Sequence, residues 1–123
     1  VEKNQDACKL IEENRIKFKC DNIEIIKGSA PEAINDLEMP THVFIGGSSG
    51  KIKEITDKVI EKNENAVFVI NAITLETVGA VNEIKNNFGY KEVVQINTSR
   101  GKYIGGYTLM NSENPVYIFT LKK

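Results

Sequence analysis

The sequence has 123 residues, of which 41% are hydrophobic, so it suits one small domain with its own core rather than two. Sixteen basic and seventeen acidic residues give a formal net charge of −1, which argues against a nucleic-acid-binding protein, because such proteins usually carry a basic excess on one face. No apolar run approaches the roughly 20 residues that span a bilayer, so no membrane partner is expected.

Cys8 and Cys20 are the only cysteines and stand near the two ends of one predicted helix. About 18 Å of helical rise would separate them, which is too far for a disulfide. We therefore interpret both as free thiols of a cytoplasmic protein. A metal site is not expected, because His42 is the only histidine and there is no second cysteine pair.

The chain opens with a predicted helix over residues 4–19 and a short predicted strand over residues 22–26. Ala7, Ile11 and Phe18 fall on one face of this helix, with Leu10 beside them. A second helix is predicted to start at Ser29. Ser29 and Glu32 have the spacing of a capping box, and Pro31 suits a first helical turn.

Two apolar strands flank the next helix. The run "HVFIG" (42–46) is almost wholly apolar, as expected of a strand covered on both faces. Ile52, Ile55 and Val59 mark a helix at the appropriate spacing. The run "AVFVI" (66–70) predicts a second buried strand.

The last helix can be capped by Thr74 and stopped by Gly89. Its apolar residues are Val78, Val81 and Phe88. Two strands follow, over 92–99 and 115–121, joined by a loop over 100–114 and with no helix between them, so we expect antiparallel neighbours. The alternation of helices and strands before them predicts an α/β fold with a doubly wound, mainly parallel sheet.

The stretch "GGSSGK" after the strand at 42–46 suggests a phosphate loop but lacks two required positions. A P-loop has glycine five residues before Gly50, where this chain has Ile45, and a hydroxyl residue after the lysine, where it has Ile52. The dinucleotide pattern GxGxxG also fails. Two interpretations stay open: a tight turn that uses glycine for backbone freedom, or a ligand site at the carboxyl edge of the sheet, where free N–H groups favour carboxylates or phosphates.

Four stretches, taken together at their spacings, resemble one known family over essentially the whole chain. They are "GSAPEAINDL", "VFIGGSSGKIKEI", "VINAITLETV" and "INTSRGKYIGGYTLMNSENPVYIF". They are similar to the corrin-pathway methyltransferase that methylates carbon 15 of precorrin-6B and decarboxylates a ring acetate in cobalamin biosynthesis. The resemblance implies S-adenosylmethionine (SAM) as cofactor and a (cobalt-)precorrin tetrapyrrole as substrate.

The resemblance also implies the class I SAM methyltransferase fold, with strand order 3-2-1-4-5-7-6 and the seventh strand antiparallel. Matched to that fold, the chain starts at the carboxyl end of strand 2. Strand 1 and its glycine-rich SAM loop would then be missing. We therefore expect residues 1–123 to be the C-terminal two-thirds of a single, N-terminally truncated domain.

The resemblance implies cofactor contacts at Glu2, Ser29, Ala30, Gly46 and Gly47. Glu2 matches the acidic residue that accepts hydrogen bonds from the SAM ribose hydroxyls, and Ala30 falls at the adenine. Relatives commonly have Asp where this chain has Ser29, so Ser29 could contact the adenine amino group or cap the predicted helix. Gly46 and Gly47 begin the loop that faces the transferred methyl group.

Substrate contacts are expected at Ser48, Asn71 and Arg100. Ser48 lies in the loop that faces the tetrapyrrole, and Asn71 ends the neighbouring strand, although it could equally be a turn former. Arg100 is the best candidate to clamp a precorrin carboxylate, because its planar fork pairs with carboxylates; Lys51 and Lys102 are weaker ones. No catalytic residue is named, since methyl transfer mainly needs alignment.

Two alternatives remain beside this function. One is a class I methyltransferase of another substrate, such as tRNA; the other is an inactive folded fragment that lacks the SAM loop. We expect a homo-oligomer, and a second corrin methyltransferase could be fused to the protein or act beside it.

Overall fold

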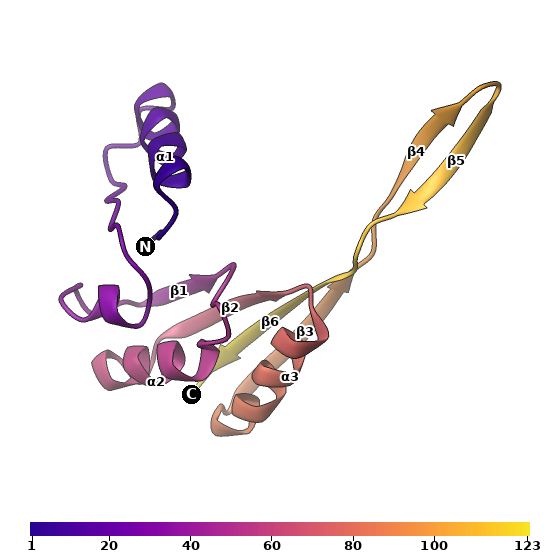
Figure 1. Cartoon of the computed structure of the whole chain (residues 1–123). Coiled ribbons are helices and arrows are strands. Elements are labelled where there is room, and N and C mark those ends of the chain that lie inside the picture. Colours follow the sequence, from indigo (N-terminus) through magenta and orange to yellow (C-terminus); the bar gives the residue numbers. More distant parts are fainter. The chain divides into compact units, whose positions relative to one another are not determined.

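The computed structural model describes residues 1–123, which form two compact units, Val1–Met39 and Pro40–Lys123 (Figure 1). The first unit contains α1 (Gln5–Lys17) and the 3-10 turn η1 (Glu32–Ile34). The second unit contains, in chain order, β1 (His42–Ile45), α2 (Ile52–Lys62), β2 (Val67–Ala72), α3 (Leu75–Ile84), the 3-10 turn η2 (Lys85–Asn87), β3 (Tyr90–Ile96), β4 (Ser99–Ile104), β5 (Tyr107–Ser112) and β6 (Val116–Lys122).

The predicted first helix is confirmed as α1, and Asn4 is its N-cap. The Asn4 side-chain oxygen accepts hydrogen bonds from the N–H groups of Asp6 at 2.9 Å and Ala7 at 3.0 Å, which otherwise have no helical partner. The predicted apolar residues of this helix are only partly buried. Ala7 and Ile11 are half-buried, Leu10 and Phe18 are exposed, and Cys8 is the buried residue of the helix.

Two predictions for the rest of the first unit are wrong. Residues 22–26 are not a strand, because no other strand pairs with them. The isolated parallel bridge between Glu2 and Lys27 lies just after this segment. The segment after Ser29 is not an α-helix but the single turn η1, whose N-cap position, Pro31, offers no side-chain hydrogen bond. The expected capping box therefore does not form.

The second unit is built on a four-stranded sheet with the order β1-β2-β6-β3 (Figure 1). β1 and β2 are parallel, and β6 lies between β2 and β3 and is antiparallel to both. Three of the four strands therefore run in one direction. The predicted antiparallel pairing of the last two core strands is confirmed, and the order 4-5-7-6 of the class I fold is reproduced.

One face of this sheet forms the core of the unit. Its buried residues alternate along the strands and meet α2 and α3, as the period of a strand requires: Ile45, Phe68, Ile70, Ala72, Phe119 and Leu121. The helices contribute Ile52, Ile55, Val59, Val81 and Ile84. The predicted α2 face and the two predicted strands are thus confirmed in place.

Three details of the second unit differ from prediction. β1 is covered on one face only: Ile45 is buried, but Phe44 on the opposite face is 67% exposed. α3 is capped by Thr74 as predicted, but it ends at Ile84, and Phe88 is buried beyond the helix. Gly89 is therefore not its stop, because η2 already closes the helix end.

The predicted loop over residues 100–114 is a β-hairpin. β4 and β5 pair only with each other, from Ser99 opposite Ser112 to Ile104 opposite Tyr107, and form a separate two-stranded sheet. Gly105 and Gly106 make the two-residue turn, where Gly105 has a positive φ of 59°, as primed hairpin turns require. Figure 1 shows the hairpin extending away from the four-stranded sheet.

Candidate functional site

In the first unit, two backbone hydrogen bonds hold Glu2 beside the segment that leads into Ser29 and Ala30. The Glu2 N–H donates to the Ile26 carbonyl at 3.0 Å, and the Gly28 N–H donates to the Glu2 carbonyl at 3.0 Å. Ser29 and Ala30 follow Gly28 directly. Residues that are far apart in the sequence are therefore held side by side by the Glu2–Lys27 bridge.

Gly28 has no room for a side chain at this point. A Cβ there would lie 2.8 Å from the Cβ of Ala33, closer than two carbon atoms approach. The Ala33 N–H also donates to the Ser29 carbonyl at 2.9 Å. The backbone that carries Ser29 and Ala30 is thus packed against the turn η1.

The Glu2 side chain joins this arrangement to α1. Its Oε1 accepts a hydrogen bond from the Asn4 N–H at 2.7 Å, which leaves Oε2 outside that bond. The Cys8 thiol donates to the Glu2 carbonyl at 3.4 Å. The Glu2 main chain and carboxylate are therefore fixed from several directions.

Ser29 does not cap a helix. Its hydroxyl donates to the neighbouring Ala30 carbonyl at 3.5 Å, a long and local bond. Ser29 is exposed and Ala30 is half-buried. Of the two interpretations of Ser29, helix capping is thus excluded by this geometry, and contact with an adenine stays a prediction.

In the second unit, the glycine loop and Asn71 meet at the carboxyl edge of the parallel strand pair. β1 and β2 align Ile45 with Ile70, so Gly46 and Asn71 follow at the same level. Asn71 is the second-last residue of β2 and is half-buried. A Cβ at Gly46 would lie 3.0 Å from the ring of Phe44, so the exposed aromatic side chain lies against Gly46.

In the glycine loop, the backbone requires a glycine at Gly50 but not at Gly47. Ser49 and Gly50 have positive φ values of 50° and 83°, and the Lys51 N–H donates to the Ser48 carbonyl at 3.0 Å to close the turn. Gly47 has no positive φ, and a Cβ there would have no atom within 4 Å.

α2 starts directly after this turn, and no side chain caps its N-terminus. The first N–H groups of the helix have no acceptor within the helix itself. The tight-turn interpretation is confirmed at Ser49 and Gly50. The interpretation as a ligand site stays a prediction.

Arg100 lies on β4 rather than in a loop, opposite Asn111. Its Nε donates to the carboxylate of Glu113, and its side chain is 76% exposed. Since Ala72 of β2 and Gln95 of β3 both pair with Tyr117, the hairpin leaves the sheet at the edge where Asn71 lies. Arg100 thus has a carboxylate partner within the chain.

The eight predicted residues fall into two groups. Glu2, Ser29 and Ala30 belong to the first unit, and the bridge brings them together. The others belong to the second unit. Gly46, Gly47, Ser48 and Asn71 lie where β1 and β2 end, whereas Arg100 lies on β4 of the separate hairpin. The roles of all eight stay predictions.

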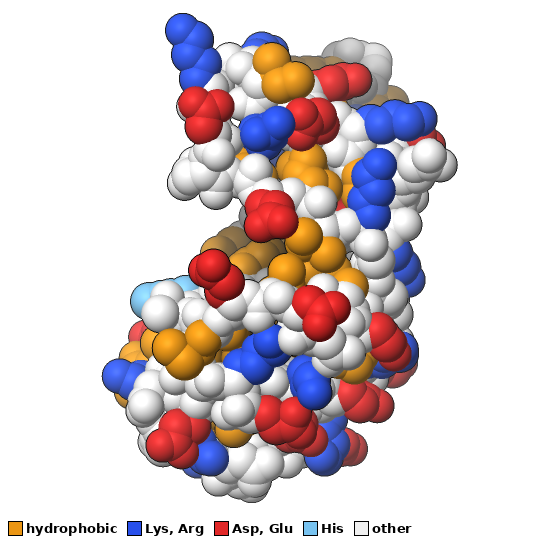
Figure 2. All heavy atoms as spheres, turned by 90° about the vertical axis from the view of Figure 1, so that its left-hand side faces the viewer, with side chains coloured by type: hydrophobic (Ala, Val, Ile, Leu, Met, Phe, Trp, Pro, Cys, Tyr) orange, Lys and Arg blue, Asp and Glu red, His pale blue; other side chains and the backbone are white.

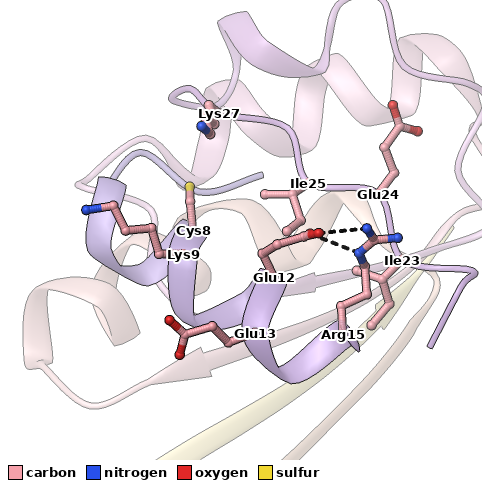
Figure 3. A pocket seen from close by; sticks show the side chains of 9 residues that line it. All are labelled: Cys8, Lys9, Glu12, Glu13, Arg15, Ile23, Glu24, Ile25 and Lys27. Carbon is pink, nitrogen blue, oxygen red and sulfur yellow. Dashed lines mark hydrogen bonds and ion pairs between the residues drawn. The ribbon is translucent and has the colours of Figure 1, made fainter. Parts of the chain in front are cut away.

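An open hollow of about 610 Å³ lies elsewhere in the first unit, between α1 and the segment after it (Figure 3). Its lining is Cys8, Lys9, Glu12, Glu13, Arg15, Ile23, Glu24, Ile25 and Lys27. Arg15 donates to both oxygens of Glu12, at 2.9 and 2.7 Å. Hydrogen bonding to Arg15 lowers the pKa of Glu12, and the same contact raises that of Arg15. The lining mixes both signs of charge and contains no predicted site residue.

The surface carries no large area of one charge on the face drawn in Figure 2, where acidic and basic side chains are interspersed. No group of three or more metal-ligating side chains is placed to hold a metal ion. No helix is both long and apolar enough to cross a membrane. Cys8 and Cys20 are free.

Comparison with known proteins decides the family. The family model described as "Precorrin methyltransferase domain" matches residues 1–123. The chain belongs to the precorrin methyltransferase domain family. A curated relative from Sulfurisphaera tokodaii, named "Probable cobalt-precorrin-6B C(15)-methyltransferase (decarboxylating)", is 39% identical over 124 residues, which cover 96% of this chain. The chain spans 62–63% of the length of the first curated relatives it matches, a little under two thirds.

Solved structures confirm the fold of this precorrin methyltransferase domain. A structure titled as precorrin-6y C5,15-methyltransferase from Geobacter metallireducens is 36% identical, with a TM-score of 0.84 over 98% of this chain and 65% of its own. A SAM-dependent O-methyltransferase from Thermotoga maritima shares the fold alone, at 18% identity and a TM-score of 0.66 over 98% of this chain and 47% of its own. The predicted class I α/β fold is therefore correct.

Sequence reasoning missed two residues that shape the site. Phe44 lies against Gly46. The sequence signal for it was an aromatic residue at an alternating position of a strand, which we predicted to be covered on both faces. Asn4 fixes the Glu2 carboxylate and the start of α1 together. Its signal was a preferred N-cap residue directly before the helical periodicity.

Proposed function

We propose that this chain is the C-terminal two-thirds of an enzyme of cobalamin biosynthesis. The enzyme methylates a (cobalt-)precorrin tetrapyrrole at carbon 15 with SAM and decarboxylates a ring acetate. The observation that carries the proposal is the family match over residues 1–123, together with the 39% identity to a relative with that name.

SAM is the proposed cofactor, and it supplies an electrophilic methyl group on a sulfonium. Glu2 would accept the ribose hydroxyls, and Ser29 and Ala30 would contact the adenine. The geometry supports this assignment, because Glu2 is backbone-bonded to Gly28, next to Ser29. A carboxylate oxygen outside the Asn4 bond suits a hydroxyl donor.

The edge formed by Gly46, Gly47, Ser48 and Asn71 is the proposed place of the methyl group and the tetrapyrrole. Gly47 supports the assignment most directly, because neither its backbone nor any neighbouring atom requires a glycine there. A missing side chain at such a position suits the close approach of a flat macrocycle. The uncapped N-terminus of α2 suits one of its carboxylates.

Arg100 is proposed to bind a precorrin carboxylate. Its present partner, Glu113, is itself 47% exposed. An exposed ion pair is worth little, on the order of 0–1 kcal/mol, so a substrate carboxylate can replace Glu113 at small cost. The guanidinium fork then keeps two parallel hydrogen bonds available.

The two alternatives are less well supported. A tRNA substrate would call for a basic surface, whereas the net charge is −1 and the charges on the face of Figure 2 are mixed. An inactive folded fragment is consistent with a chain that spans only part of its relatives. Activity of the longer protein would exclude that alternative for the enzyme but not for these residues alone.

A homo-oligomer, fused to or acting beside a second corrin methyltransferase, is part of the proposal. So is a cytoplasmic location, which the two free thiols favour.

The test is turnover of the longer protein with SAM and a cobalt-precorrin-6B-type substrate, followed by mass spectrometry. The expected product has gained one methyl group and lost one carbon dioxide. Methyl transfer to tRNA but not to the tetrapyrrole would instead establish the first alternative. Methylation without loss of carbon dioxide would remove the decarboxylation from the proposal.

A further inference from the structure

Two exposed aliphatic side chains, Ile73 and Leu75, directly follow the end of β2. Ala72, the last residue of the strand, is fully buried, whereas Ile73 is 54% and Leu75 82% exposed. No other leucine, isoleucine, valine or methionine of the chain is as exposed as Leu75. Single apolar residues on a surface are common and need no special role. Two of them within one three-residue segment, next to the proposed tetrapyrrole edge, call for a physical reason.

The segment 73–75 lies at the same edge of the sheet as the glycine loop. β1 and β2 are parallel, and their register places Ile45 beside Ile70. The glycine loop follows β1 and the segment 73–75 follows β2, so both connections leave the sheet at its carboxyl edge. α2 and α3 start where these connections end, and the two helices contact each other. The segment therefore continues the edge that is proposed to hold the tetrapyrrole.

Hydrogen bonds hold this segment in one conformation. The Thr74 hydroxyl oxygen accepts from the Thr77 N–H at 3.2 Å, and the two threonine hydroxyls lie 3.0 Å apart in a hydrogen bond. The Val78 N–H donates to the Thr74 carbonyl at 3.0 Å. Thr74 lies between Ile73 and Leu75, so the backbone that carries both aliphatic side chains is fixed before a ligand arrives. Such preorganisation lowers the entropy cost of binding.

The start of α3 does not explain why residue 75 is a leucine. Ile73 precedes the N-cap, where it can pack against Val78 as a hydrophobic staple, which gives Ile73 a structural role. Leu75 is the first residue of the helix, a position that favours proline or an acidic residue. Its side chain forms no cap, because Thr74 does so. Leu75 is therefore the residue on which the inference depends most.

The charges around the segment favour an apolar ligand group. From Asn71 to Ile84 the sequence contains no lysine or arginine, and its charged residues are Glu76 and Glu83. The next cation, Lys85, lies about 15 Å of helical rise beyond Leu75. A ligand carboxylate would find no partner here and would be repelled by Glu76. The segment therefore suits the uncharged part of a ligand.

We propose that Ile73 and Leu75 are specificity-determining residues that contact the apolar ring face of the tetrapyrrole. The inference rests on the proposed function and adds to it the part of the substrate that this segment recognises. A conjugated macrocycle has a flat, apolar face and carries its carboxylates at the rim. Aliphatic side chains bind such a face by removing apolar surface from water on both partners.

The test is Leu75→Gln in the longer protein, with Leu10→Gln as the matched control. Glutamine is similar to leucine in helix propensity, and Leu10 is also an exposed helical leucine, at 57%, but lies on α1. Titration with a cobalt-precorrin-6B-type tetrapyrrole measures binding. We expect the dissociation constant to rise about tenfold in Leu75→Gln, because a leucine contact is lost, and to stay unchanged in Leu10→Gln. SAM affinity and the melting temperature should not change in either protein.

Two further variants test the chemistry of the contact. Leu75→Met keeps an apolar side chain of similar volume and should bind the tetrapyrrole like the wild type. Ile73→Thr keeps the β-branched shape but adds a hydroxyl, so it should bind more weakly. Because salt screens charges but not apolar burial, the loss in Leu75→Gln should persist at high salt.

Tetrapyrrole binding of wild-type strength in a folded Leu75→Gln protein would overturn the inference. So would a loss that disappears at high salt, or one that SAM affinity follows in step. The wild type is titrated first, which separates this inference from the proposed function. A wild type that does not bind the tetrapyrrole would overturn both, whereas a wild type that binds it beside an unaffected Leu75→Gln would overturn the inference alone.

Discussion

The Oε1 of Glu2 accepts a hydrogen bond from the Asn4 N–H at 2.7 Å, and the Asn4 side chain in turn caps α1. One carboxylate is therefore placed both to hold the start of a helix and, in the proposed function, to bind a ribose. The two roles can be separated by substitution, because they use different atoms.

Glu2→Gln tests the ribose role. Glutamine keeps a side-chain oxygen for the Asn4 N–H but loses the charge, so the fold should persist while SAM binding of the longer protein weakens by about 1–3 kcal/mol. Calorimetry with SAM measures the loss, and a melting curve serves as control. An unchanged dissociation constant would show that Glu2 does not contact the ribose.

Asn4→Ala tests the structural role. It removes the acceptor for the N–H groups of Asp6 and Ala7, so the free energy of unfolding should fall by about 0.5–2 kcal/mol. Asn4→Asp retains an acceptor and should recover most of this loss. Denaturant titration of the three proteins decides the matter; equal stability of wild type and Asn4→Ala would mean that the cap contributes nothing.

Two alanine substitutions in the glycine loop should behave differently. Gly50 has a φ of 83°, so Gly50→Ala places a Cβ in left-handed backbone and should cost about 1–2 kcal/mol of stability. Gly47→Ala meets no atom within 4 Å and should leave stability unchanged.

Gly47→Ala also tests the proposed tetrapyrrole site. If the tetrapyrrole approaches Gly47, then Gly47→Ala should weaken its binding in the longer protein while the melting temperature stays constant. Fluorescence titration with the precorrin measures the affinity. Full precorrin affinity in a stable Gly47→Ala protein would place the substrate elsewhere.

Arg100→Ala tests the clamp. We expect it to weaken precorrin binding by about 1.5–3 kcal/mol, the worth of a hydrogen bond to a charged group, and to leave SAM affinity alone. Arg100→Lys should recover only part, because the fork is lost. Glu113→Gln is the matched control, because it removes the ion pair of Arg100 and should not weaken precorrin binding. A parallel loss of both ligands in Arg100→Ala would assign Arg100 to the hairpin structure instead.

The residues 1–123 alone should bind SAM at least tenfold more weakly than the longer protein. In the proposed function these residues are the C-terminal two-thirds of the enzyme, and the methionine half of the cofactor site is expected to lie in the part before them. Calorimetry of the two proteins side by side measures the difference. Equal affinities would show that the residues of this chain suffice for the cofactor.

The sequence predicted the elements whose periodicity reflects burial. Ile52, Ile55 and Val59 are all buried in α2, and Phe68 and Ile70 alternate in β2, because packing on one face sets both patterns. The prediction of a strand over residues 22–26 was wrong, because no packing partner sets its pattern. Its β-branched residues favour extended backbone, but a strand exists only with a partner, and the one bridge nearby, between Glu2 and Lys27, lies after the segment.

The candidate site was predictable in its positions but not in its local chemistry. Gly46 and Asn71 meet because adjacent parallel strands end at one edge, which the predicted topology implies. That Glu113 pairs with Arg100 depends on a hairpin that carries no burial pattern at all. Its only signal was the glycine pair at residues 105–106 between residues that favour strands.

The place of β6 in the sheet has a consequence for synthesis of the protein. β6 is made after β2 and β3, yet it lies between them. Until β6 has left the ribosome, β1 and β2 can pair, but β3 has no neighbour in the sheet. A nascent chain with such unpaired strands is prone to aggregate, and pausing during this interval would lower the yield of folded protein.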